Sequence, residues 1–78
     1  MIIRVGGYTQ NKVKEIVKCE NLNRANDEVK RMKEDGYCGI QVMVICLEKA
    51  NIPKIFEYLG YEETKQGDRI RYYLLRCY

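Results

Sequence analysis

Four cysteines are the side chains of this chain best suited to metal or redox chemistry. They stand far apart, and no two form the Cys-x-x-Cys pair that zinc sites use. A zinc site would need four separate segments to converge on one point, so we expect no metal ligands. We expect small, buried, reduced cysteines, with a disulfide framework as the open alternative. The residues are Cys19, Cys38, Cys46 and Cys77.

Acid–base and nucleophilic chemistry lacks its usual side chains. The chain contains no histidine and no serine, so neither a Ser-His-Asp triad nor a Cys-His dyad can be built. Glu62 and Glu63 are neighbours on a predicted strand, where they point to opposite faces and cannot serve one reacting atom. Gly6-Gly7 lacks the further glycines and the helix start of a phosphate loop and indicates a bulge. We expect no catalytic residue.

Charge is distributed unevenly along a chain whose net charge is +3. Residues 1–24 carry five basic and two acidic side chains, whereas residues 25–68 carry six basic and nine acidic side chains. Residues 69–78 add three arginines and no acid. If the two terminal strands lie near each other in the sheet, they form a basic patch.

Arginine and tyrosine alternate along the last segment, in a chain with seven tyrosines. Tyrosine is favoured where one end of a ring is packed and the other is wet, as in binding hot spots. Alternate strand residues share a face, so either face shows arginine beside tyrosine. The predicted partner-binding residues are Tyr72, Arg76 and Tyr78 on one face and Arg69, Arg71 and Tyr73 on the other.

The elements in the first half follow from hydrophobic periodicity. Ile2 to Tyr8 predicts a strand, and Lys12 to Cys19 predicts a second strand with one wet face, where Ile16 falls among the lysines. Asn21 caps a predicted helix and Gly36 ends it. The buried stripe of this helix is Leu22, Ala25, Val29 and Met32.

The second half predicts a central strand and another helix. Ile40 to Leu47 is apolar at every position except Gln41, so we expect both of its faces to be buried. Asn51 caps a short helix that has Pro53 in its first turn and ends at Gly60. Its expected buried stripe is Ile52, Ile55, Phe56 and Leu59.

A hairpin ends the chain: Gly67-Asp68 is a turn signal, and the flanking strands are Tyr61 to Gln66 and Arg69 to Cys77. We find no linker, repeat or low-complexity segment, so residues 1–78 are expected to form a single domain. The predicted fold is α+β, a small mixed sheet of about five strands with two helices in the order ββαβαββ.

Four segments from Glu34 onward carry a resemblance to a known family. They are Glu34-Asp35-Gly36-Tyr37, the strand Ile40 to Leu47, Ile55-Phe56-Glu57-Tyr58-Leu59-Gly60-Tyr61 and the strand around Arg71-Tyr72-Tyr73. Over residues 24–77 the chain resembles the C-terminal half of GNAT acetyltransferases. The resemblance implies acetyl-CoA as a cofactor, bound through backbone amides of the Ile40 to Leu47 strand. The family's Gly-rich acyl-CoA loop is missing at Cys19 to Arg24, and its general-acid tyrosine falls on Phe56, which implies a degenerate member.

We therefore expect a non-enzymatic binding module, of the inhibitor or adaptor kind that phages and mobile elements encode, acting on a protein partner. The alternatives are a degenerate GNAT-like acetyltransferase that binds acyl-CoA and a binder of single-stranded nucleic acid. A homodimer is a further possibility for so small a domain. No stretch approaches the roughly 20 apolar residues of a membrane helix. Met1-Ile2-Ile3-Arg4 also lacks the layout of a secretory signal, so we expect a cytoplasmic protein.

Overall fold

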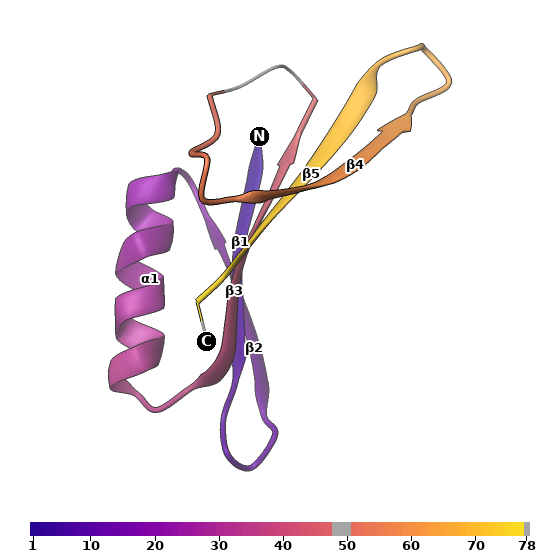
Figure 1. Cartoon of the computed structure of the whole chain (residues 1–78). Helices are drawn as coiled ribbons and strands as arrows, with labels where there is room; N and C mark the ends of the chain where they lie inside the picture. The colour runs from indigo at the N-terminus through magenta and orange to yellow at the C-terminus, as the bar shows by residue number, and fades with distance from the viewer. Residues whose placement is uncertain (48–50, 78) are drawn as a thin grey trace.

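A computed structural model describes residues 1–47 and 51–77, which form one helix and five strands (Figure 1). The elements are β1 (Ile2–Tyr8), β2 (Lys14–Cys19), α1 (Leu22–Glu34), β3 (Cys38–Cys46), β4 (Glu57–Glu63) and β5 (Arg69–Arg76). The predicted α+β class is confirmed. The order is ββαβββ in place of the predicted ββαβαββ.

The strands form one sheet in the order β2-β1-β3-β5-β4, and each neighbouring pair is antiparallel. The expectation of a mixed sheet is therefore wrong for the described residues. A parallel pair needs a crossover connection, whereas β4 and β5 form a hairpin that returns to pair with β3. The prediction that Ile40 to Leu47 lies at the centre of the sheet is confirmed, because β3 is the middle strand.

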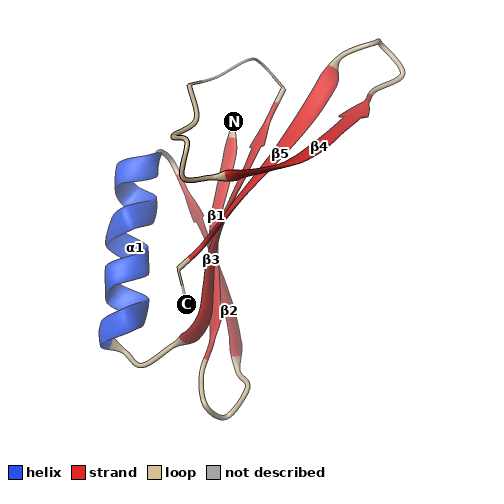
Figure 2. Cartoon of the chain, viewed as in Figure 1, coloured by secondary structure: helices blue, strands red, loops and turns tan. Residues whose placement is uncertain are grey.

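The helix α1 lies along one face of the sheet and contacts β1, β2 and β3 (Figure 2). The predicted cap is confirmed, since Asn21 Oδ1 accepts a hydrogen bond of 2.9 Å from the Arg24 N–H. The predicted end at Gly36 is also confirmed. Gly36 adopts a φ of +81°, and the Tyr37 N–H reaches back to the Met32 carbonyl at 2.9 Å, as in a Schellman motif.

The hydrophobic core lies between α1 and the three strands it covers. Ala25, Val29 and Met32 of the predicted helix stripe are buried there, and Leu22 packs at the edge. At Gly7 the helix approaches the sheet closely, since an added Cβ would lie 3.3 Å from the Met32 sulfur. The sheet contributes the buried side chains Ile3, Val5, Cys19, Ile40, Val42, Val44 and Cys46.

The predicted second helix at residues 51–59 is wrong. Only a single turn forms there, in which the Phe56 N–H donates to the Pro53 carbonyl at 3.0 Å. The next residues join β4, because pairing with β5 satisfies their backbone groups and outweighs a helical periodicity only two turns long. Of the predicted stripe, Ile52 and Phe56 pack against the core, whereas the other two positions, Ile55 and Leu59, are exposed.

The prediction that both faces of the central strand are buried is also wrong. From Ile40 to Cys46 the face of β3 toward α1 is buried, but on the opposite face Gln41 is exposed and Met43 and Ile45 are half-buried. With one helix, the described residues provide only one covering layer for the sheet. The second helix, which would have supplied another layer, is replaced by β4.

The two hairpins follow the sequence more closely. The bulge expected at Gly6-Gly7 is confirmed as a register shift between β1 and β3. Ile16 faces the same side as Lys14 and Lys18, as predicted, and is 58% exposed. In the second hairpin Gly67 adopts a φ of +87°, and the Thr64 N–H donates to the Asp68 carbonyl at 2.8 Å, so the turn is confirmed.

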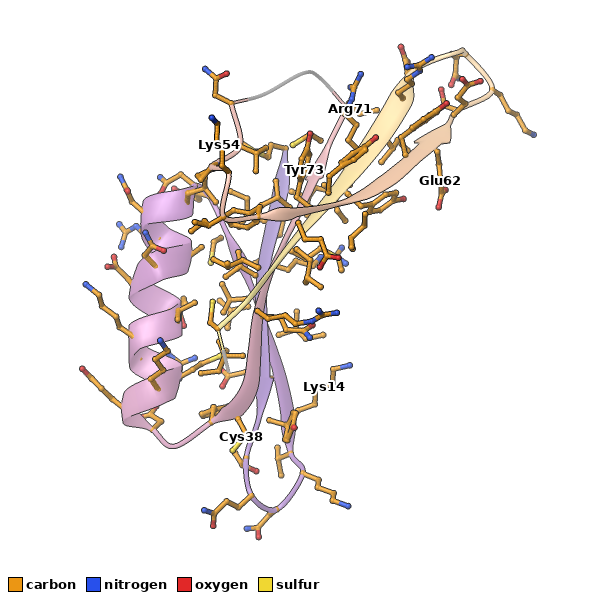
Figure 3. The ribbon with its side chains drawn as sticks, in the orientation of Figure 1. Lys14, Cys38, Lys54, Glu62, Arg71 and Tyr73 are labelled. Atoms are coloured by element: carbon orange, nitrogen blue, oxygen red, sulfur yellow. The ribbon has the colours of Figure 1, made fainter. Side chains whose placement is uncertain are left out.

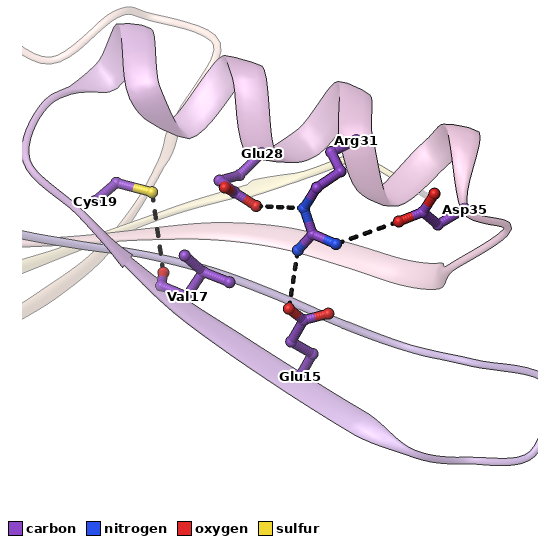
Figure 4. Close-up of polar contacts among 6 residues, drawn as sticks. All are labelled: Glu15, Val17, Cys19, Glu28, Arg31 and Asp35. Carbon is purple, nitrogen blue, oxygen red and sulfur yellow. Dashed lines mark hydrogen bonds and ion pairs between the residues drawn. The ribbon is translucent and has the colours of Figure 1, made fainter.

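An arginine on α1 joins the helix to the edge of the sheet (Figure 4). Arg31 donates to Glu28 at 2.8 Å and to Glu15 of β2 at 2.9 Å, and it lies 3.3 Å from Asp35. A hydrogen bond from Tyr37, followed by the charge and hydrogen bond of Arg31, lowers the pKa of Glu15 against an opposing desolvation. The same contact with Glu15 raises the pKa of Tyr37.

This cluster makes stability depend on pH. Because the pKa of Glu15 is lowered in the folded protein, its contribution is present above the ordinary carboxyl pKa of 4.5 and is lost as pH falls through the folded value. We expect Glu15→Gln to lower the urea midpoint at neutral pH, and the difference from wild type to shrink in acid. Glu20→Gln, at an exposed site just past β2, is the matched control. A constant difference across this range would contradict the account.

Candidate functional site

Among the described residues, no element covers the face of the sheet turned away from α1. We call it the open face. Its residues follow from the strand pairing, because residues opposite one another in antiparallel strands point to the same side. Lys14 illustrates the direction, on the side of β2 away from the helix (Figure 3). From β2 to β5 the open face carries Lys14, Ile16, Lys18, Ile2, Arg4, Gly6, Tyr8, Gln41, Met43, Ile45, Tyr72, Leu74 and Arg76.

Positive charge dominates the open face. Lys18 stands directly opposite Arg4 in the β1–β2 pair, and like charges in this position are unfavourable. No ion pair is found for Arg4, Lys14 or Lys18 within residues 1–47 and 51–77. Arg76, across the sheet, does have an acidic neighbour, Glu57 of β4 at 3.7 Å. The β2–β1 side of the face therefore carries uncompensated positive charge.

A hollow of about 460 Å³ is sunk into this charged part of the open face. Gly6 is one of its lining residues and leaves space there, because an added Cβ would meet nothing nearer than the Glu15 carbonyl oxygen at 3.7 Å. Tyr8 lies directly over Gly39, whose φ of +59° and missing side chain leave room for the ring. The lining residues are Arg4, Gly6, Gly7, Tyr8, Lys14, Ile16, Gly39, Gln41 and Met43.

The structure distributes the sequence-predicted site residues over two surfaces. Tyr72 and Arg76 lie on the open face, and Arg69, Arg71 and Tyr73 point to the opposite side of β5, the split that strand alternation predicts. Tyr78 lies outside the described residues. The structure describes five of the six predicted partner-binding residues, and these five do not form one patch.

The helix side of the β4–β5 hairpin forms a second, smaller surface, because α1 contacts neither strand in the described residues. The hairpin projects past the helix, and Figure 3 shows Arg71 and Tyr73 on it. Its groups largely contact one another. Arg69 lies 4.7 Å from the centre of the Tyr61 ring and 3.8 Å from Glu63, and the rings of Tyr58 and Tyr73 are 5.3 Å apart. This surface thus presents less unpaired charge than the open face.

Sequence reasoning missed Arg4, Lys14, Lys18 and the hollow as site features. Two signals pointed toward them: the excess of basic residues over 1–24, and Ile16 on the wet face of its strand. The hollow itself depends on Gly6 and the ring of Tyr8 on β1 meeting Gly39 on β3, with β2 completing the lining. Local spacing does not reveal such a meeting, because it is set by strand register.

All four cysteines are free, so the structure contains none of the disulfides that the sequence left open as an alternative. Cys19 and Cys46 are buried in the core and Cys77 packs against it, as predicted, whereas Cys38 is exposed and that part of the prediction is wrong. Burial raises the pKa of the Cys19, Cys46 and Cys77 thiols. In the described part of the chain, no three acidic, cysteine or histidine side chains gather as a metal site would require.

Over residues 1–47 and 51–77, no helix combines the length and apolar character needed to cross a membrane. The backbone of β3 is paired with β1 on one side and with β5 on the other from Gln41 to Ile45, so the strand that the family resemblance assigns to acyl-CoA is engaged on both sides.

Comparison of the chain with protein-family models, with curated proteins and with solved structures finds no match. Function is therefore inferred from the surface alone.

Proposed function

We propose that this chain is a non-enzymatic binding module of the inhibitor or adaptor kind, and that its open face docks onto an acidic surface of a larger protein. The observation that carries the proposal is a set of three cations, Arg4, Lys14 and Lys18, that form no ion pair within residues 1–47 and 51–77 and lie beside a concave patch. Placing Lys18 opposite Arg4 costs stability in the free domain. An acidic partner would relieve this repulsion, so complementary charge favours the complex and speeds its formation.

The side chains at the centre of the open face favour a protein over single-stranded nucleic acid. Binders of single strands stack bases on exposed aromatic rings. The middle of this face instead holds Gln41, Met43 and Gly6, and the Tyr8 ring lies at its end over Gly39. A mixture of aliphatic groups, one amide and a cationic rim is suited to apolar anchors and carboxylates of a protein surface.

A titration with defined probes tests the proposal. The first probe is a soluble peptide in which glutamates flank phenylalanines, and the second is the same peptide with every glutamate replaced by glutamine. We expect fluorescence anisotropy to show tighter binding of the glutamate peptide, weakening as salt rises because exposed charges are screened. Equal binding of the two peptides, or no dependence on salt, would overturn the proposal.

Two further probes decide between classes of ligand. Single-stranded DNA that binds more tightly than the glutamate peptide at the same salt would replace the protein partner with nucleic acid. Acetyl-CoA belongs in the same series because of the GNAT resemblance, and micromolar binding by calorimetry would favour the degenerate acyltransferase. We expect neither result.

A further inference from the structure

We propose that the hollow over Gly6 is an anchor pocket for a single apolar side chain of the partner that lies next to a carboxylate. This inference rests on the proposed function and goes beyond it, because it names the chemical group that the partner must present. The partner's recognition element is then an aromatic or branched aliphatic residue beside an acidic residue.

The lining of the hollow supplies both halves of this chemistry. Ile16 and Met43 provide apolar lining, and the Tyr8 ring, which lies against Gly39, provides an aromatic part of it. Arg4 and Lys14 lie at the same hollow and carry no ion pair among the described residues. An apolar group can therefore leave water while a neighbouring carboxylate meets a cation at the rim.

The hollow has room for one anchor side chain together with the carboxylate beside it. Its volume of about 460 Å³ lies near the lower end of the roughly 300 to 1,000 Å³ range of small-molecule sites. Binding hot spots in protein interfaces are such pockets, filled by one well-packed side chain and ringed by polar contacts.

Gly6 makes the pocket testable without disturbing the fold. Its φ is not positive, and a Cβ there would make only ordinary contacts, at 3.7 Å with the Glu15 carbonyl oxygen and 3.8 Å with Ile16 Cγ1. A valine at this position therefore fits a strand and projects into the hollow. Gly39, in contrast, combines a positive φ with the overlying Tyr8 ring and is unsuitable for such a test.

The direct experiment uses small stand-ins for the anchor, observed through the amide chemical shifts of the full chain by NMR. Phenylpropionate carries an aromatic group and a carboxylate, phenylpropionamide lacks the charge, and phenethylamine reverses it. We expect phenylpropionate to shift the amides of Gly6, Gly39 and Gln41 with millimolar affinity, as is normal for so few atoms. Binding should weaken severalfold for the amide and disappear for the amine.

Variants then locate the binding. Gly6→Val should abolish the shifts while keeping the dispersed spectrum of the folded protein, and Gly6→Ala should weaken binding to a lesser degree. Ile16→Ser, at a site already 58% exposed, removes apolar lining and provides a second test should the valine variant not fold. The Lys14→Gln variant should reduce the affinity for phenylpropionate but leave that for the amide unchanged.

The outcomes separate this inference from the proposed function. If the glutamate peptide binds wild type and Gly6→Val equally, the open face binds an acidic protein without using the pocket, and only the anchor inference fails. Shifts from phenylpropionate that lie outside the lining residues, or none at all, overturn it in the same way. If the glutamate and glutamine peptides bind equally while phenylpropionate still occupies the hollow, the proposed function fails and the pocket stands.

Discussion

Truncating Met32 to alanine will lower the free energy of unfolding by about 3 kcal/mol, whereas the same truncation of Met43 will cost about 1 kcal/mol or less. Met32 of α1 packs against one face of the sheet, and Met43 of β3 lies on the other face. Met32 is 0% exposed between α1 and the sheet, where its sulfur faces Gly7, and Met43 is half-buried on the open face. The two variants therefore compare the same substitution on the covered face and on the uncovered face of the sheet.

Urea denaturation followed by circular dichroism measures both values. For a domain of this size a loss of about 3 kcal/mol is a large part of the total stability of roughly 5 kcal/mol or more, so the Met32 variant should unfold at a much lower urea concentration. A Met43 variant as damaged as the Met32 variant would contradict a one-sided core. If that damage also depended on protein concentration, the open face would be covered by a second copy of the chain, the homodimer expected as an alternative from the sequence.

Reversing the charge of Arg4, Lys14 and Lys18 to glutamate will weaken binding of the glutamate peptide roughly a hundredfold. Each exposed pair contributes up to about 1 kcal/mol, and a tenfold change in affinity corresponds to about 1.4 kcal/mol. The fold should persist, because all three side chains are exposed and their replacement removes no core contact.

The matched control reverses three exposed cations away from the open face: Arg24 and Lys30 on α1 and Lys65 in the turn of the β4–β5 hairpin. Both triple variants change the net charge equally, so a difference between them reports position rather than overall charge. Anisotropy titrations at two salt concentrations provide the measurement. An equal loss in the two variants would show that binding depends only on net charge, against a docking surface on the open face.

Elements fixed by local sequence were predictable. The ends of α1 at Asn21 and Gly36 were predictable because capping and a positive φ are local requirements. The strand β1 follows from residue alternation, and the final turn follows from the placement of its glycine. The second helix failed for the opposite reason. The spacing from Ile52 to Leu59 fits a helix, but pairing with β5, the next strand and outside that segment, decides the conformation. A short local pattern does not contain this information.

The candidate site was only partly predictable. The split of Arg69, Arg71 and Tyr73 from Tyr72 and Arg76 follows from strand alternation alone. Which of the two faces is covered depends on the strands against which α1 packs and on the absence of a covering helix at 51–56, both of which are tertiary facts. The basic patch predicted from the two ends of the chain does form in part, because β1 and β5 both pair with β3 and place Arg4 and Arg76 on the same face.

The most direct test of docking through the open face is to map the bound glutamate peptide by the amide shifts of the full chain. The account predicts that the largest changes fall on β1, β2 and β3, at Gly6, Ile16 and Gln41, with little change in the outer surface of α1. Changes concentrated on α1, or on the helix side of the β4–β5 hairpin around Tyr58 and Arg71, would contradict it.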